Sequence, residues 1–304
     1  MKCSCIPTLL RKPHLFHRVT TVSLEEFHTL TDKLESEWME REIRRLSSRT
    51  RINTIGQGRH YEIGEFPNLV LCTLLYLRTS IGYELLGLLC GVDKTTVRRV
   101  VTRTLPLLQD RFMPDTPLNP KKRRTNNLDD LLKEFPELKD VIFDGTELPI
   151  KRPKRYQKRS YSGKKKRHTK KVQLALDKKT MLVVGISPPR RGRMHDKRQV
   201  ETTGWNERLS PSVLRWGDLG YQGMAGWRIP HKKPRGGTLT LSQKRYNKRL
   251  AKERIVVEHG IRRMKVFRRI GETVTAKTDD LLFTTLRAAA NLSNFKWLLR
   301  HGLG

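Results

Sequence analysis

The spacing of hydrophobic residues divides the chain into helical and strand-like parts. Residues 66–109 carry apolar side chains at helical intervals. Residues 23–49 predict a highly charged helix, which opens with Ser23 and Glu26 at the spacing of a capping box. Three short runs of apolar and β-branched residues are typical of strands instead: 140–145, 171–177 and 180–186. Only two lysines separate the last two runs, which predicts a hairpin.

The remainder of the second half alternates between the two patterns. A helical segment around 196–208 precedes a further strand at 212–218, and residues from about 241 to 300 are helical again. Strands in mixed order with helices between them favour an α/β or α+β core.

Two short helices joined at Gly91 are predicted within ELLGLLCGVDKTTVRRVVTRTL, residues 84–105. Asp93 stands where an N-cap belongs. The inner face of the second helix is Val97, Val100 and Val101, and its outward residues include Thr95, Thr96, Arg98, Arg99 and Arg103. This arrangement is typical of a helix-turn-helix that binds DNA, with residues 66–79 as a support helix. An ordinary helical hairpin with a solvated basic face is the alternative.

A proline-rich segment, MPDTPLNPKKRRTNN at 113–127, separates the two halves and leads into a short predicted helix at 128–135. We therefore divide the chain into four parts: a helical segment (1–60), a helix-turn-helix domain (61–112), a linker with the short helix (113–137) and a catalytic domain (138–304).

The charge balance strengthens the DNA interpretation. The chain has 63 Lys and Arg against 30 Asp and Glu, a formal charge of +33. Such a field attracts polyanions, and nucleic acid is the natural partner. An anionic membrane is the runner-up, but the sequence has no apolar run long enough to span one and no basic helix with a clean apolar face. We expect binding to double-stranded DNA and none to membranes.

The cysteines indicate a reducing compartment. Cys3 and Cys5 lack the spacing of a zinc site, while Cys72 and Cys90 stand in apolar runs that favour buried free thiols. No apolar signal segment opens the sequence. We expect an intracellular, cytoplasmic protein associated with the nucleoid.

A dense basic stretch lies between two predicted strands. Residues 151–171 contain twelve Lys or Arg and no acid, with Tyr156 and Tyr161 interleaved. Contact with the phosphates of DNA is the obvious use, and the tyrosines could stack on an unpaired base. A solubilising or localisation loop is the alternative.

Two aspartates end predicted strands. Asp144 follows VIF and precedes Gly145, and Asp218 follows VLRWG. A carboxylate held on a stiff strand, with glycine turning the backbone away, suits a divalent cation. An Asp-Gly turn without further function is the alternative for each.

A third carboxylate, Glu258, lies in KERIVVEHGIRRMK. On a helix it shares one stripe with Arg254, Arg262 and Lys265. The local pattern favours a ladder of ion pairs four residues apart. A metal ligand among phosphate-binding cations is the other possibility, and Glu253, nearer the apolar side, is the weaker candidate.

Taken together, these residues resemble the DDE transposases of the insertion-sequence five family and the related plant-type endonucleases. The matching stretches span about 140–295: FDGTELPI, KRSYSGKKKRHTKKVQLALD, RMHDKR, GDLGYQG, HKKPRGG, KERIVVEHGIRRMK and AAANLSN. The resemblance implies an α/β fold with an RNase H-like core, a mixed sheet flanked by helices, preceded by an all-α helix-turn-helix domain.

The resemblance also implies a catalytic, metal-binding triad of Asp144, Asp218 and Glu258, holding two Mg²⁺ ions for which Mn²⁺ can substitute. The family signature around the glutamate fits Arg254, Glu258 and Lys265, but its tyrosine position holds Ala251. His195 and Asp196 either contribute to the site or form local turn and cap structure.

The resemblance implies a transposase that binds terminal inverted repeats, cleaves the DNA ends and joins the 3′-hydroxyl to target DNA, as a homodimer or larger oligomer. A domesticated nuclease and a catalytically silent DNA-binding protein are the alternatives. The DNA-binding residues that we expect are Lys94, Thr95, Thr96, Arg98, Arg99, Arg103, Lys164, Lys165, Lys166, Arg167, His168, Arg254, Arg262 and Lys265.

Overall fold

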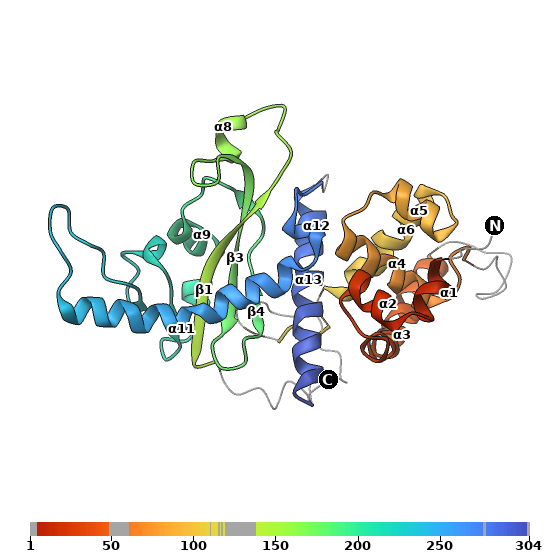
Figure 1. Ribbon diagram of the computed structural model, residues 1–304, viewed down its shortest axis with the longest axis horizontal. Helices are drawn as coiled ribbons and strands as arrows, with labels where there is room; N and C mark the ends of the chain where they lie inside the picture. The colour runs from red at the N-terminus through yellow and green to blue at the C-terminus, as the bar shows by residue number, and fades with distance from the viewer. Residues whose placement is uncertain are drawn as a thin grey trace.

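The computed structural model describes residues 5–48, 61–109, 111–114, 116, 118, 138–275 and 278–302 (Figure 1). The predicted helix at 128–135 and most of the predicted linker lie outside these residues. The first half is helical: α1 (Cys5–Leu10), α2 (Pro13–Thr20), α3 (Leu24–Ser47), α4 (Phe66–Thr79), α5 (Tyr83–Cys90) and α6 (Lys94–Thr104), followed by a 3₁₀ turn (Leu105–Leu108).

Local signals place these helices as predicted. The capping box of Ser23 and Glu26 opens α3. Gly91 ends α5 in the left-handed conformation, with a φ of 65° that glycine adopts without steric cost. The Asp93 carboxylate then accepts the amide hydrogen of Thr95 at 2.8 Å and caps α6. The helix-turn-helix geometry is therefore confirmed.

The second half forms a seven-stranded mixed sheet within the described residues, in the order β2-β3-β1-β6-β7, with β4 and β5 also paired to β3. The strands are β1 (Asp140–Pro149), β2 (Tyr161–Ser162), β3 (Arg167–Asp177), β4 (Val183–Ile186), β5 (Arg190–Arg191), β6 (Leu214–Trp216) and β7 (Trp227–Arg228). The accompanying helices are α8 (Gln157–Ser160), α9 (Asp196–Thr203), α10 (Trp205–Arg208), α11 (Leu241–Lys265), α12 (Arg268–Gly271) and α13 (Asp279–Arg300), with a 3₁₀ turn at Leu219–Tyr221.

One prediction about β1 is wrong. Asp144 does not end the strand, because β1 continues to Pro149 and pairs with β3 along that whole length. What ends near Asp144 is the ladder to β6, whose last pair is Ile142–Trp216. Gly145 is required for close packing rather than for a turn, since a Cβ there would collide with the Asp196 carboxylate.

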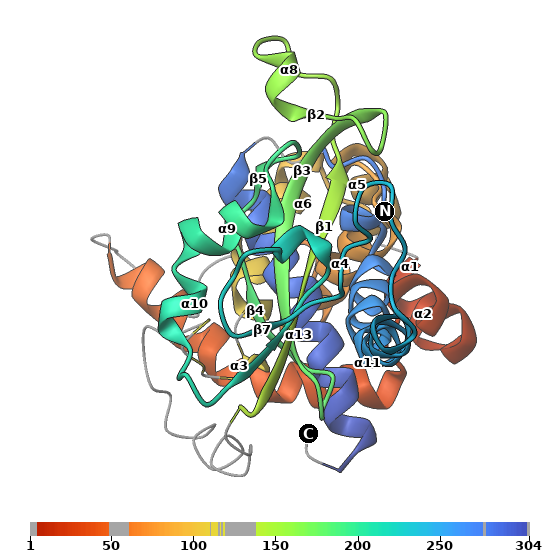
Figure 2. The same ribbon diagram turned by 90° about the vertical axis from the view of Figure 1, so that its left-hand side faces the viewer.

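The basic stretch 151–171 is also more ordered than a connecting loop. It contains α8 and β2, and its last five residues already belong to β3. The hairpin turn falls at Gly163–Lys166, where Lys166 has a φ of 52°. This hairpin and α8 project beyond the rest of the sheet (Figures 1 and 2).

Helices cover both faces of the sheet (Figure 2). One face of β1 and β3 packs Val141, Phe143 and Ala175 against Trp205 and its neighbours around α9 and α10. The other face packs against α11 and α13, where Gly260 allows α11 to approach Leu176 closely. The sheet therefore lies between two helical layers.

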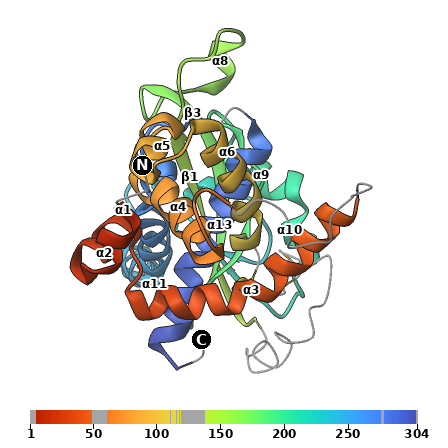
Figure 3. The same ribbon diagram turned by 90° about the vertical axis from the view of Figure 1, so that its right-hand side faces the viewer.

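The apolar core continues from the sheet into the N-terminal helices. α13 packs against the 3₁₀ turn after α6, and the rings of Phe112 and Phe295 lie 4.5 Å apart. α13 stands between the sheet and the helices α1–α6 (Figures 1 and 3). The apolar core thus runs from the predicted helix-turn-helix domain into the predicted catalytic domain without a break. The four predicted domain boundaries therefore stay a prediction. Within the described ranges, no helix is long and apolar enough to cross a membrane.

Candidate active site where the β1–β6 ladder ends

Parallel pairing brings Asp144 and Asp218 to the same level of the sheet. Ile142 pairs with Trp216, and each aspartate lies two residues further along. One oxygen of each carboxylate is held by the backbone: Asp144 Oδ1 accepts from the Gly145 amide at 2.9 Å, and Asp218 Oδ1 accepts from the Gly220 amide at 2.8 Å. No residue that the structure describes donates to either Oδ2, so both second oxygens remain available to a ligand.

A third carboxylate, Asp196 at the start of α9, approaches from the opposite face of the sheet. Its Oδ2 accepts a hydrogen bond from Lys171 Nζ at 2.9 Å, while its Oδ1 is buried with no hydrogen-bond partner among the described residues. A Cβ placed on Gly220 would lie 2.8 Å from both Asp196 Oδ2 and Asp218 Oδ1. The glycine therefore allows two carboxylates to approach the same backbone position closely.

The grouping of acids changes the pKa of Asp144. Burial raises the pKa of this carboxyl to about 6, the Arg254 guanidinium opposes that rise, and the negative charges of Asp218 and Asp196 add to it. A carboxyl that loses its proton only near neutrality, beside two other acids, marks a place where a cation would be strongly favoured.

The helix α11 carries positive charge to the same place. Its inner face is buried at Val257, Gly260 and Met264. Arg254 and Lys265 lie on the next face of the helix, and the positive charge of each interacts with the negative charge of Asp144. Burial lowers the pKa of the Lys265 ammonium, and the nearby positive charge of Lys165 lowers it further. Cations from α11 thus lie near Asp144, and Lys165 of the β2–β3 hairpin lies near Lys265.

Glu258 lies on α11 between Arg254 and Lys265 in helical position, and its side chain is exposed. The ladder with Arg254 and Arg262 that the sequence favours does not form, because no ion pair joins Glu258 to any residue in the described part of the chain. Glu253 instead pairs with Lys178 at 2.8 Å. That ion pair accounts for Glu253 without any role in chemistry.

These residues fit a divalent cation in part. Asp144 and Asp218 supply hard oxygen donors from stiff elements, and Gly220 lets the Asp196 carboxylate lie close to Asp218. However, across the described ranges no three His, Cys, Asp or Glu side chains come close enough together to hold a metal ion. Glu258 is not gathered with the aspartates, and its role as third ligand stays a prediction.

The residues predicted to bind DNA lie mainly on the surface. Lys94, Thr95, Arg98 and Arg99 on α6 are exposed, as are Lys164–Arg167 in the hairpin and Arg262 on α11. Five others are half-buried: Thr96, Arg103, His168, Arg254 and Lys265.

Two of the half-buried residues have protein partners. The Arg103 guanidinium donates to Tyr61 Oη at 3.2 Å, and Tyr61 in turn donates to Glu42 of α3. His168 contacts Ser160 Oγ at 3.1 Å. These contacts tie the recognition helix and the hairpin to neighbouring elements.

Asp196 is surrounded by a polar network that the sequence patterns did not predict. Gln173 Nε2 donates to the Asp196 backbone carbonyl at 3.0 Å and to Tyr221 Oη at 2.9 Å. Lys171 also donates to the Met194 carbonyl at 3.1 Å. The alternation along β3 could have shown that Lys171 and Gln173 share one face. His195 occupies the N-cap position of α9 through its backbone, without a side-chain cap, which agrees with the local turn-and-cap alternative.

Comparison with known proteins agrees with this geometry. Residues 143–294 match the family model for DDE superfamily endonucleases, and residues 65–114 match the model for the helix-turn-helix of these endonucleases.

Two relatives bear names as transposases of insertion sequence elements. That of IS702 from Microchaete diplosiphon is 35% identical over 202 residues, which cover 65% of this chain and 69% of the relative. That of IS112 from Streptomyces albus G is 28% identical over 217 residues, covering 71% and 75%. Members of this superfamily generally depend on divalent metal ions. This chain therefore belongs to the DDE superfamily of endonucleases and transposases.

Proposed function

We propose that this protein binds the terminal inverted repeats of an insertion element, cleaves the DNA ends and joins the 3′-hydroxyl to target DNA. Asp144, Asp218 and Glu258 are the proposed metal ligands. The observation that carries the proposal is the position of Asp144 and Asp218, each two residues beyond the last pair of the β1–β6 ladder, with the pKa of Asp144 raised to about 6.

The proposed cofactor is Mg²⁺, two ions per site, with Mn²⁺ as a substitute. When bound, the ions would activate water or a DNA 3′-hydroxyl and neutralise the leaving oxygen. The protein's own residues do the positioning. Asp144 and Asp218 present oxygens from a rigid sheet, while Arg254 and Lys265 neutralise the phosphates on either side of the scissile bond.

DNA binding is proposed to use two surfaces. The exposed Thr95, Arg98 and Arg99 of α6 would contact base edges and phosphates of the terminal repeat. The hairpin residues Lys164–Arg167 would contact the backbone nearer the cut. We further propose that two or more copies assemble when two ends are joined, and that the protein works inside the cell, at the DNA.

A cleavage assay tests the proposal. The wild-type chain is incubated with labelled duplex carrying the inverted repeat that flanks its gene, in Mg²⁺, in Mn²⁺ and in EDTA. We expect cleavage at the repeat end in either metal and none in EDTA. Asp144→Asn should bind the same duplex with unchanged affinity and cut it about 10³-fold more slowly or not at all.

Asp140→Asn is the matched control. Asp140 lies on the same strand but accepts a hydrogen bond from Trp216 Nε1 at 2.7 Å. The Asp140→Asn protein should cleave at nearly the wild-type rate. Cleavage that persists in EDTA, or that survives Asp144→Asn, contradicts the proposal. Specific binding without any cleavage would identify a silent DNA-binding protein instead.

A further inference from the structure

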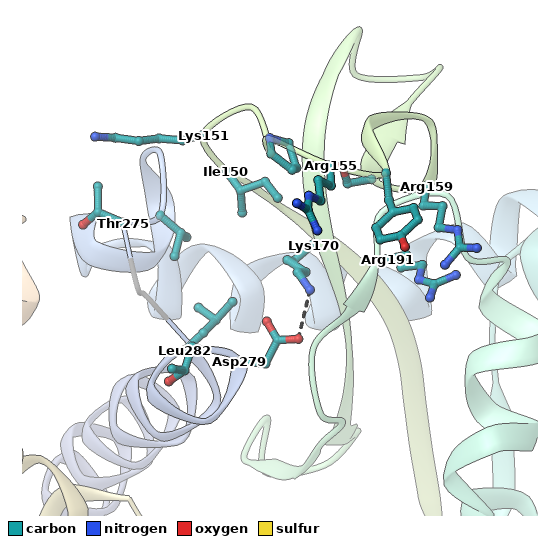
Figure 4. Close-up of a pocket in the computed structure, with 14 residues that line it drawn as sticks. Ile150, Lys151, Arg155, Arg159, Lys170, Arg191, Thr275, Asp279 and Leu282 are labelled. Carbon is teal, nitrogen blue, oxygen red and sulfur yellow. Dashed lines mark hydrogen bonds and ion pairs between the residues drawn. The ribbon is translucent and has the colours of Figure 1, made fainter.

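A pocket of about 510 Å³ opens beside the strand that carries Asp144 (Figure 4). Its wall comes from the segment after β1, from α8, from Lys170 of β3 and Arg191 of β5, and from the residues around the start of α13. The volume suits a single nucleotide and excludes a base-paired duplex.

The lining of this pocket is strongly cationic. Lys151, Arg155, Arg159, Lys170 and Arg191 line it, against one acid, Asp279. Asp279 is paired with Lys170 at 2.9 Å, as the dashed line in Figure 4 marks. None of the other four cations forms an ion pair with a residue that the structure describes. Four uncompensated positive charges around one concavity favour an anion such as a phosphate.

The pocket also has features that a bare phosphate would not use. Ile150, Val274 and Leu282 form an apolar part of the lining, and Val274 and Leu282 are themselves buried. Tyr156 stands at the pocket with 72% of its surface exposed. The guanidinium of Arg159 lies 4.7 Å from the centre of the Tyr156 ring. An exposed ring braced by a cation is a platform on which a base can stack.

The backbone at Tyr156 supports a binding role. Its φ of 54° places a bulky non-glycine residue in the left-handed region, which costs free energy. Since the ring is exposed, burial of Tyr156 does not offset that cost. A role of the Tyr156 ring in stacking on a ligand would explain why this strained backbone conformation is kept.

The pocket lies within reach of the proposed cleavage site. Leu174 of β3 pairs with Asp144, and Lys170 stands four residues before Leu174 on the same strand. At about 3.3 Å per residue, the pocket is roughly 13 Å from Asp144 along the sheet. That distance corresponds to a few nucleotides of DNA.

We propose that this pocket receives one unstacked nucleotide of the DNA strand that passes Asp144 and Asp218, with its base on Tyr156 and its phosphate among the cations. The inference rests on the proposed function, since the ligand is part of the substrate. Extruding a base costs least where the base is already unpaired. An unpaired base at the right position should therefore strengthen binding.

The test measures affinity for terminal-repeat duplexes in which a single mismatch is moved one position at a time past the cleavage site. Wild-type protein should bind one of them about fivefold or more tightly than the fully paired duplex, the low end of a base–aromatic stack. Tyr156→Ala should lose this preference and bind paired DNA as before. Tyr156→Phe should keep it.

Tyr161→Ala is the matched control, because Tyr161 is a second exposed tyrosine of the same basic segment and does not line this pocket. It should keep the preference, and all variants should unfold at the wild-type temperature. A preference that survives Tyr156→Ala, or no preference at any position while paired repeats still bind, overturns the inference alone. Absence of any repeat binding overturns the proposed function with it. Tyr156-dependent binding of free deoxyadenosine monophosphate, with no mismatch preference, would assign the pocket to a free nucleotide and also overturn the inference.

Discussion

The three acids proposed as metal ligands occupy two different settings. Asp144 and Asp218 are held level by strand pairing, each with one oxygen fixed by a backbone amide. Glu258 is exposed on α11, without a partner among the described residues, although Arg254 and Lys265 on its flanks act on Asp144. The difference suggests that the sheet prepares half of the site, and that the helix completes it only when metal and DNA are present.

The largest expected effect separates these two halves. Asp218→Asn should weaken binding of a divalent ion to the DNA-free protein by about 10²-fold or more, because one ligand charge at close range is worth several kcal/mol. Glu258→Gln should leave this affinity within about threefold, since Glu258 is not gathered with the aspartates. Luminescence of Tb³⁺, read through the nearby tryptophans, measures both.

Both variants should nevertheless cut terminal DNA at least about 10³-fold more slowly than the wild type. A Glu258→Gln protein that loses ion binding as completely as Asp218→Asn would show that the helix carboxylate joins the site before DNA arrives. That result would remove the difference between the two settings.

The next effect compares the two glutamates of α11. Glu258→Gln should abolish cleavage, whereas Glu253→Gln should leave the rate nearly unchanged. Glu253 forms a partly exposed ion pair with Lys178, so its loss should cost at most about 1 kcal/mol of stability. Cleavage rates and urea unfolding of both variants decide the matter. A Glu253→Gln protein that folds but does not cleave DNA would indicate that Glu253, and not Glu258, is the metal ligand.

A smaller effect concerns what the grouped aspartates cost without a cation. The pKa of Asp144 is about 6 in the folded protein against an ordinary 3.8. The folded state therefore holds this proton more tightly than the unfolded state, and stability falls as pH rises from about 4 to 6 and stays lower above that. Asp144→Asn removes this cost and should stabilise the metal-free protein by up to about 3 kcal/mol at pH 8.

At pH 4 most of the gain from Asp144→Asn should be lost, because the wild-type carboxyl is then protonated in the folded state and partly protonated in the unfolded state. Urea unfolding in EDTA at the two pH values measures it. Asp140→Asn, whose amide oxygen can still accept the hydrogen bond from Trp216 Nε1, should leave stability at pH 8 nearly unchanged. Equal stability of Asp144→Asn and wild type at pH 8 would mean that neither burial nor the neighbouring aspartates raise the pKa of Asp144.

The helix-turn-helix could be predicted closely because its signals are local. Residues 66–79 form α4 as expected, and Asp93 caps α6 two residues after the glycine that ends α5. Capping and helical spacing act within a few residues, so the sequence alone carries them.

The sheet edge was harder to predict because strand pairing decides it. The glycine after Asp144 suggested a turn, but β1 continues because β3 pairs with it as far as Pro149. Lys171 and Asp196 meet although 25 residues separate them. Asp144 and Asp218 are 74 residues apart in the sequence, and they lie at the same height in the sheet only because of the parallel register of β1 and β6. Such contacts have no local signature, and the exposure of Glu258 could not be read from helical spacing either.

The smallest expected effect tests the electrostatic link between the two halves of the site. The Arg254 guanidinium lowers the pKa of Asp144, so Arg254→Gln should raise that pKa further. If Asp144 must be ionised to hold metal, the acid limb of the cleavage pH profile should move to higher pH. The rate at low pH should then fall more than the rate at high pH.

Arg262→Gln is the control, because Arg262 is exposed on the same helix and does not act on Asp144. It should weaken DNA binding slightly and leave the acid limb in place. If both variants lower the rate equally at every pH, Arg254 serves only to bind phosphate. If only Arg254→Gln moves the limb, α11 already tunes the strand aspartates before Glu258 joins them, and the helix contributes to both halves of the site.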